Sequence, residues 1–236
     1  MEMSVIIPTL NEEKNIGKLL IYLKNQLQGV AFELIVADAG SSDNTSEISM
    51  KNGAIVLNCE RMCRAHQMNE GARIAKGAIL YFVHADARPP ANFFEAIQSA
   101  INHGYELGCF RFKFDSNRFL LAINSYFTRF KALAFRGGDQ TLYITEGAFK
   151  KLNGFNGKMR IMEEYDFIIR AKKLFKFKVI PKEVIVSARK YEENSYWRVN
   201  FANLVVFTLF RWGASQQFML NTYNILIKHP KAESLK

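Results

Sequence analysis

Short apolar runs alternate with segments of helical periodicity through the first hundred residues. The runs have the length and the β-rich composition of buried strands, and the segments between them repeat apolar residues three and four positions apart. The predicted strands cover residues 3–8, 32–37, 54–57 and 78–83, and the predicted helices cover residues 11–27, 42–50, 63–75 and 91–102. This alternation predicts βαβ units, and therefore an α/β protein with a mostly parallel sheet that helices cover on both faces.

The second half of the chain has a less regular pattern. Residues 108–114 alternate apolar and basic side chains, as a half-exposed strand does, and further strands are predicted at 139–145 and 178–188. Helices are predicted at 117–136 and 163–175, and residues 195–227 are mostly helical in pattern. Because no repeat or long linker divides the chain, we expect a single domain over residues 1–228 and a polar tail at 229–236.

Polar residues follow three of the predicted strands. They read PTLNE at 8–12, DAGS at 38–41 and HAD at 84–86. Because ligands bind outside the carboxyl ends of parallel strands, we expect these residues to converge on one edge of the sheet. Asp38 there suits a ribose hydroxyl or a base N–H, and Asp86 beside His84 suits Mg²⁺ or Mn²⁺. The alternative for each carboxylate is to cap the helix that follows it.

Acidic residues crowd the start of the helix predicted at 163–175, where Glu163, Glu164 and Asp166 lie within four positions. Two interpretations stay open. The carboxylates could complement the helix dipole. Alternatively, three acids that repel one another suit a site where one of them acts as a base.

Positive charge dominates the chain, with a net charge of +10 and a pI of about 9.5. This balance favours an anionic partner, such as nucleotide phosphates, nucleic acid or an acidic membrane face. Arg61, Arg64 and Gln67 lie at the start of the helix predicted at 63–75, where they could meet a diphosphate or form a solvated face. The other basic residues are scattered rather than gathered on one recognition helix, which makes nucleic acid the least favoured partner.

Several protein classes fit the sequence poorly. Three cysteines without a CxxC pair predict neither a disulfide framework nor a zinc site, and favour a reducing cytosol. The first residues lack the basic segment of a signal peptide, and the longest uncharged apolar run, 203–210, is too short to span a bilayer. We therefore expect a cytoplasmic protein. Neither GxGxxG nor GxxxxGK[ST] occurs, which disfavours the dinucleotide and P-loop classes.

Six segments in this order resemble the inverting GT-A glycosyltransferases of family 2. They are SVIIPTLNEEKNI (4–16), ELIVADAGSSDNT (33–45), RAHQMNEGARIAKGAILYFVHADARPP (64–90), GDQTLYI (138–144), LNGFNGKMRIMEEYDFIIRAKK (152–173) and VIVSARKYE (184–192). The chain is most similar to a bacterial subgroup that has HAD in place of the usual DxD motif. The resemblance implies a GT-A fold with a Rossmann-like sheet, a nucleotide-binding half at 1–104, an acceptor half at 105–228 and a C-terminal helical extension.

The resemblance also implies roles for individual residues. It implies nucleotide-sugar contacts for Pro8, Glu12, Asp38, Arg64 and Asp86, and metal binding by Asp86 with His84. It places Asp139 and Gln140 on the acceptor or donor-sugar side. Glu164 would be the general base, with Glu163 as its rival. Two departures stand out. Many relatives have two acids after the second strand, where this chain has Asp38 and Ala39. With His84 in place of an aspartate, the metal site also carries less negative charge.

The resulting hypothesis is a metal-dependent inverting glycosyltransferase. It would move a sugar from a nucleotide-diphosphate sugar to an acceptor hydroxyl, and a lipid-linked or membrane-associated acceptor would place it at the inner face of a membrane. One alternative is a nucleotidyltransferase, although the segment PTLNEEKN is no phosphate loop. The other is a non-catalytic protein that binds a membrane surface through the aromatic and basic segments 117–136 and 196–212.

Overall fold

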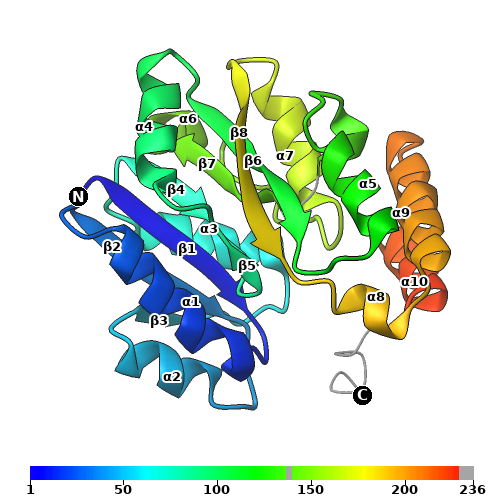
Figure 1. The fold of residues 1–236 in the computed structure, drawn as a ribbon, viewed down its shortest axis with the longest axis horizontal. Coiled ribbons are helices and arrows are strands. Elements are labelled where there is room, and N and C mark those ends of the chain that lie inside the picture. Colours follow the sequence, from blue (N-terminus) through cyan, green and yellow to red (C-terminus); the bar gives the residue numbers. More distant parts are fainter. Residues whose placement is uncertain (137–139, 229–236) are drawn as a thin grey trace.

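A mixed β-sheet runs through the computed structural model, which describes residues 1–136 and 140–228 (Figure 1). Among these residues eight strands form the sheet, in the order β3-β2-β1-β4-β7-β6-β8-β5. The strands are β1 (Met3–Thr9), β2 (Phe32–Asp38), β3 (Ile55–Asn58), β4 (Ile79–Phe82), β5 (Ala87–Arg88), β6 (Leu107–Phe114), β7 (Leu142–Thr145) and β8 (Phe177–Val186). Strands β1 to β4 are parallel, and β7 joins β4 to β6 through two antiparallel pairings.

Helices connect the strands and cover both faces of the sheet. They are α1 (Glu13–Gln26), α2 (Thr45–Lys51), α3 (Arg64–Ile74), α4 (Phe93–Asn102), α5 (Phe119–Phe127), α6 (Glu146–Lys151), α7 (Glu163–Ala171), α8 (Lys190–Glu193), α9 (Tyr196–Arg211) and α10 (Gln216–Leu226), with a short 3₁₀ helix η1 (Leu133–Phe135). None of these helices is long and apolar enough to cross a membrane, in the part of the chain that the structure describes.

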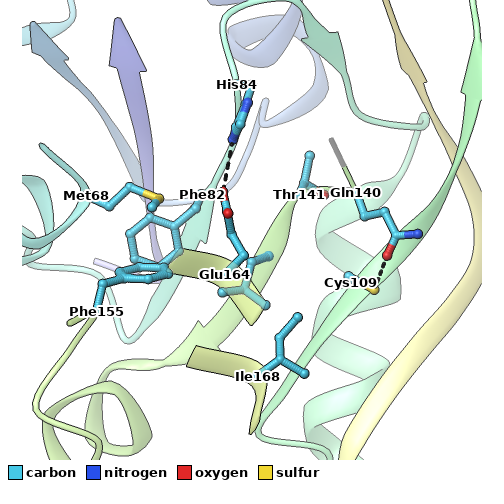
Figure 2. A pocket seen from close by; sticks show the side chains of 10 residues that line it. Met68, Phe82, His84, Cys109, Gln140, Thr141, Phe155, Glu164 and Ile168 are labelled. Carbon is cyan, nitrogen blue, oxygen red and sulfur yellow. Dashed lines mark hydrogen bonds and ion pairs between the residues drawn. The ribbon is translucent and has the colours of Figure 1, made fainter. Parts of the chain in front are cut away.

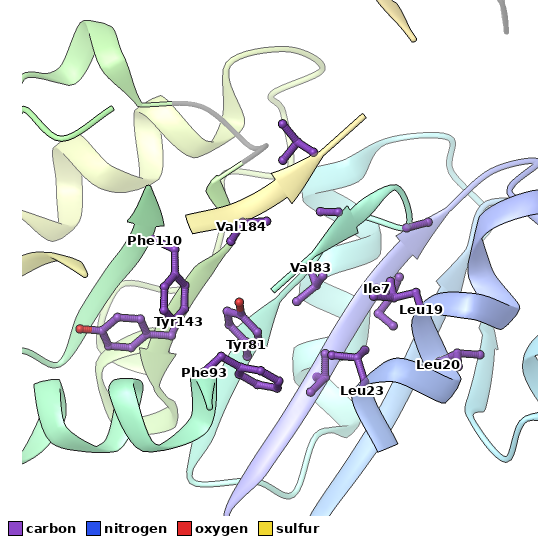
Figure 3. Close-up of a cluster of buried hydrophobic side chains, with 14 of the residues drawn as sticks. Ile7, Leu19, Leu20, Leu23, Tyr81, Val83, Phe93, Phe110, Tyr143 and Val184 are labelled. Atoms are coloured by element: carbon purple, nitrogen blue, oxygen red, sulfur yellow. The ribbon is translucent and has the colours of Figure 1, made fainter. Parts of the chain in front are cut away.

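Two apolar cores form on opposite faces of the sheet, because successive strand residues point to opposite sides. Val5 and Ile7 of β1 belong to the first core, where the apolar face of α1 and the aromatic residues of α4 and β7 pack together (Figure 3). Ile6 belongs to the second core, which α3, α6 and α7 cover. Strand β1 is therefore buried on both sides, as its unbroken apolar run predicts.

The strand and helix pattern predicted for the first hundred residues is confirmed, with boundaries shifted by a few positions. The α/β fold class is also confirmed. One prediction for the second half is wrong in part. The segment 117–136 is not one helix, because α5 ends at Phe127 and Nη2 of the buried Arg136 donates to the carbonyls of Thr128 and Phe130. The mostly helical pattern predicted for 195–227 is confirmed: it consists of α9 and α10, with a break at Gly213, whose φ of +75° favours glycine.

Candidate active site

The carboxyl ends of β1, β2 and β4 meet at one edge of the sheet, as the polar strand ends predict. Thr9 of β1 pairs with Asp38 of β2, and Pro8 lies buried beside it, opposite Ala37. The side chain of Gln67 on α3 ties the two ends together, because its Nε2 donates to the carbonyls of Thr9 at 2.8 Å and Ala37 at 2.7 Å. Gln67 is buried, so the expectation that it meets a diphosphate or belongs to a solvated face is wrong.

The carboxylate of Asp38 is 1% exposed and accepts hydrogen bonds from its own loop. Oδ1 accepts from Thr9 Oγ1 at 2.9 Å and from Ser41 Oγ at 2.5 Å, and Oδ2 accepts from Ser41 N at 2.8 Å. These bonds fix the turn at Gly40, whose φ is +82°. Asp38 therefore shapes the loop after β2, and its contact with a nucleotide stays a prediction.

Arg189, which follows β8, links the ends of β1 and β4. Its Nη2 lies 3.1 Å from Glu12 Oε1 and 2.9 Å from Asp86 Oδ2. Glu12 precedes α1 and is nearly buried, whereas Asp86 keeps a quarter of its side chain exposed. Arg189 has no role among those that the resemblance implies, although it lies in the sixth matching segment, VIVSARKYE. The only signal in the sequence was that segment, because the contact joins residues 177 positions apart.

The acidic pair Glu163 and Glu164 opens α7 and lies between the side chains of Arg64 and His84. Arg64, the first residue of α3, places its Nε 2.8 Å from Glu163 Oε1. His84 places its Nε2 3.6 Å from Glu164 Oε1 (Figure 2). Arg64 is half-exposed at the helix N-terminus, a position that suits an anion. The structure thus brings together residues from two of the six sequence segments that carried the resemblance, 64–90 and 152–173.

Burial and charge separate the pKa values of the two carboxylates. Burial raises the pKa of Glu163, and the neighbouring charge of Glu164 adds to this against the opposing pull of Arg64. Burial also acts to raise the pKa of Glu164, but the charges of Arg64 and His84 outweigh it and hold that pKa at about 2. Glu164 therefore stays ionised at neutral pH, and the pKa of Glu163 lies above that of Glu164.

A small pocket opens beside Glu164 on the face of the sheet that α7 covers (Figure 2). Its lining residues are Met68, Phe82, His84, Cys109, Gln140, Thr141, Leu142, Phe155, Glu164 and Ile168. Glu164 Oε1 is buried there, and it accepts no hydrogen bond from the described residues. Buried polar atoms without partners are rare in folded proteins, so this oxygen is available to a hydroxyl that enters the pocket.

Gln140 lines the same pocket with its amide held in place. Its Oε1 accepts from Arg136 Nη1 at 2.8 Å, and its Nε2 donates to the carbonyl of Phe135 at 2.8 Å. Arg136 was not singled out in the sequence, yet it positions Gln140 from a buried location. Asp139, the other residue predicted on this side, lies outside the described residues.

The predicted metal site has one donor of suitable chemistry. Asp86 offers a partly exposed carboxylate at the end of the strand, and Mg²⁺ or Mn²⁺ beside a nucleotide needs only one or two protein carboxylates because phosphates supply the rest. His84 faces Glu164 instead. Among the described residues no cluster of three histidine, cysteine or acidic side chains could hold a metal by itself. The residues present therefore fit a cation that Asp86 and the oxygens of a bound diphosphate would coordinate together.

Comparison with known proteins decides the family. Residues 4–180 match the model of glycosyl transferase family 2. The chain belongs to this family. The match spans the strand ends, the HAD motif and the acidic pair, so each of these features of the candidate site lies within the family region.

Relatives with curated names are similar to parts of the chain. Dolichol-phosphate mannosyltransferase of Pyrococcus furiosus is 30% identical over 112 residues, which cover 45% of this chain and 32% of that protein. Glucosyl-3-phosphoglycerate synthase of Mycolicibacterium smegmatis is 42% identical over 57 residues, which cover 24% of this chain and 19% of that protein. The chain thus matches about a third or less of these relatives' length.

Solved structures share the fold at low sequence identity. The mannosyltransferase PcManGT of Pyrobaculum calidifontis, in complex with GDP-Man and Mn²⁺, has a TM-score of 0.69 at 19% identity and covers 95% of this chain and 69% of its own. The TarS fragment 1–349 of S. aureus has a TM-score of 0.65 at 19% identity and covers 87% of this chain and 66% of its own. These similarities show the GT-A fold that the sequence predicts.

Proposed function

We propose that the protein is a metal-dependent, inverting glycosyltransferase of the subgroup with HAD in place of DxD. It would transfer a sugar from a nucleotide-diphosphate sugar to an acceptor hydroxyl. The observation that carries this proposal is Glu164 Oε1, a buried oxygen of an ionised carboxylate that lines a pocket beside the strand edge, with His84 Nε2 beyond hydrogen-bond distance at 3.6 Å. Membership of the family and the bound GDP-Man of PcManGT support a nucleotide sugar as donor.

The proposed roles follow from where the residues lie. Glu12 and Asp38 would border the nucleotide beyond β1 and at the end of β2, and Pro8, one position before the Thr9–Asp38 pair, would lie beside it. Asp86 would hold the cation, which neutralises the leaving diphosphate when it is bound. Arg64 presents a half-exposed guanidinium at the N-terminus of α3, where backbone N–H groups also favour phosphate oxygens.

The position of the two carboxylates favours Glu164 over Glu163 as the base. A base must be ionised and must reach the acceptor, and Glu164 is ionised at neutral pH and lines the pocket. Glu163 is buried against Arg64 and does not line the pocket. In the proposed step, the acceptor oxygen forms a bond to the anomeric carbon while the bond from that carbon to the diphosphate breaks. Glu164 takes the proton of the hydroxyl.

The acceptor is proposed to be lipid-linked or membrane-associated. Support comes from the family relative whose name gives dolichol phosphate as its substrate. A cytoplasmic location at the inner face of a membrane follows from this proposal and stays a prediction. The alternative of a non-catalytic binding protein gives no reason for an ionised carboxylate that is buried in a pocket. The nucleotidyltransferase alternative gains nothing from the family match.

The variant Glu164→Gln tests the role of the base. We expect the variant to bind the donor as the native protein does and to lose transfer activity by about 100-fold or more, the usual contribution of a positioned base. Glu163→Gln is the matched control, because it changes the neighbouring carboxylate in the same way outside the pocket. A folded Glu164→Gln protein with full transfer activity would contradict the proposal.

A further inference from the structure

Helix α9 is apolar on two opposite faces. Val199, Ala202 and Val206 point inward and are buried. The other face carries Trp197, Phe201 and Leu204, whose side chains are 72%, 56% and 62% exposed. These residues are four and three positions apart, so their side chains form one stripe along the helix. A helix that is apolar all round is normally covered on all sides. We therefore expect another surface to bind and cover the outer stripe of α9.

Trp212 extends this stripe at the C-terminal end of α9 and is 80% exposed. Arg211 beside it is also exposed. Helix α5 lies next to α9, since Asn124 Nδ2 donates to Asn200 Oδ1 at 3.0 Å, and α5 exposes further aromatic residues (Figure 1). Tryptophan and phenylalanine with nearby arginine form the side-chain set that binds at the boundary of a bilayer.

The charge of the region identifies the covering surface as anionic. The chain has 22 acidic residues, but none of them lies in segments 116–136 or 194–228, which together supply α5, α9 and α10. Arginine and lysine residues do occur in both segments, among them Arg129, Lys131, Arg198 and Arg211. Two copies of this face would bring like charges together, which disfavours self-association. Anionic lipid headgroups complement both the charge and the aromatic side chains.

We propose that the outer face of α9, with Trp197, Phe201, Leu204 and Trp212, is a docking surface for an anionic membrane. The helix would lie in the plane of the interface with its inner face on the protein core. On that inner side Phe207 and Phe210 contact the ring of Tyr165, with centroids 5.6 and 6.2 Å apart. Tyr165 follows Glu164 directly, so the membrane would lie one helix away from the acidic pair.

This inference stands apart from the proposed reaction, and only its link to a lipid-borne acceptor rests on the proposed function. Membrane binding is measured without donor or acceptor, and donor binding is measured without vesicles. Failure of one measurement therefore leaves the other interpretable.

The two tryptophans of the chain are Trp197 and Trp212, so intrinsic tryptophan fluorescence reports on this face alone. The native protein is titrated with vesicles of phosphatidylcholine, with and without phosphatidylglycerol. We expect a blue shift, and quenching by brominated acyl chains, with the anionic vesicles. High salt should weaken the binding because it screens the lipid charge. An emission spectrum that no vesicle changes would overturn the proposal.

Vesicle sedimentation of variants checks the same surface by a second route. Trp197→Ser with Trp212→Ser should lower the partition coefficient by at least about tenfold, since burial of one aromatic side chain contributes that much. Ile21→Ser with Met50→Ser, exposed positions on α1 and α2, is the matched control and should bind as the native protein does. Native binding by the tryptophan variant would overturn the proposal. So would a doubled mass in solution with a blue shift in the absence of lipid, because a second copy would then cover the stripe.

Discussion

Arg189 Nη2 lies 2.9 Å from Asp86 Oδ2, so the carboxylate predicted to bind a cation is paired with a guanidinium from the far end of the chain. The same nitrogen lies 3.1 Å from Glu12 Oε1. One guanidinium therefore contacts two carboxylates, compensates one of their two negative charges, and ties the chain after β8 to the residues that follow β1 and β4.

Removal of this guanidinium should destabilise the fold. In Arg189→Met the nearly buried Glu12 loses a charged partner, and we expect the free energy of unfolding to fall by about 1–3 kcal/mol, with the lower values favoured by the partial exposure of Arg189. Urea denaturation measures the change. A double-mutant cycle of Arg189→Met with Glu12→Gln should show that the two losses of unfolding free energy are not additive. The reason is that Glu12→Gln removes the carboxylate charge that Arg189→Met leaves without its guanidinium. Strictly additive effects would show that the pair contributes nothing.

Replacement of Glu163 and of Glu164 by glutamine should change the melting temperature of the protein in opposite directions. The raised pKa of Glu163 means that its ionised form costs stability above the ordinary pKa, so Glu163→Gln should melt at the native temperature or higher at pH 7. The lowered pKa of Glu164 means that its ionised form contributes stability at neutral pH, and Glu164→Gln should melt lower. Thermal unfolding followed by circular dichroism distinguishes the two variants.

The pH dependence of these differences has a defined sign. The loss in Glu164→Gln should shrink as the pH falls from the ordinary carboxyl pKa toward the lowered value, because Glu164 takes up a proton in the unfolded chain there while it stays ionised in the folded protein. The effect of Glu163→Gln should vanish below the ordinary pKa, where Glu163 is protonated in both folded and unfolded chains. A stabilised Glu164→Gln protein at pH 7 would reverse the assignment of the ionised member.

Asp86 and His84 should differ in their effect on metal binding. Binding of Mn²⁺ in the presence of a nucleoside diphosphate can be followed from the electron paramagnetic resonance signal of the free ion. Asp86→Ala should abolish it because the carboxylate is the metal ligand in this account. His84→Gln should retain it, since the imidazole contacts Glu164. Loss of Mn²⁺ binding in His84→Gln would make the histidine a ligand as well.

The first half of the fold could be predicted from the sequence because its physical signals are local. Strand β1 is buried on both faces, and its unbroken apolar run reports that burial directly. The polar residues after β1, β2 and β4 meet at one edge as a consequence of parallel pairing. Once the strands were recognised, the location of the candidate site followed from topology.

Contacts between distant residues could not be predicted in this way. Helical periodicity in 117–136 gives no sign that the guanidinium of Arg136 folds back onto the carbonyls of Thr128 and Phe130. Spacing likewise does not distinguish a buried Gln67 that binds backbone carbonyls from one that faces an anion. The pairing of Arg189 with Asp86 depends on the whole sheet being assembled.

Donor binding tests the central claim most directly. A thermal-shift panel of UDP, GDP and dTDP sugars, each with and without Mn²⁺, requires no knowledge of the acceptor. A ligand that binds only the folded protein stabilises it by about 2.7 kcal/mol at a hundred times its dissociation constant. We predict that at least one donor raises the melting temperature in the presence of Mn²⁺ and that Asp86→Ala removes this shift. No shift from any donor, with or without Mn²⁺, would contradict the assignment as a nucleotide-sugar-dependent glycosyltransferase.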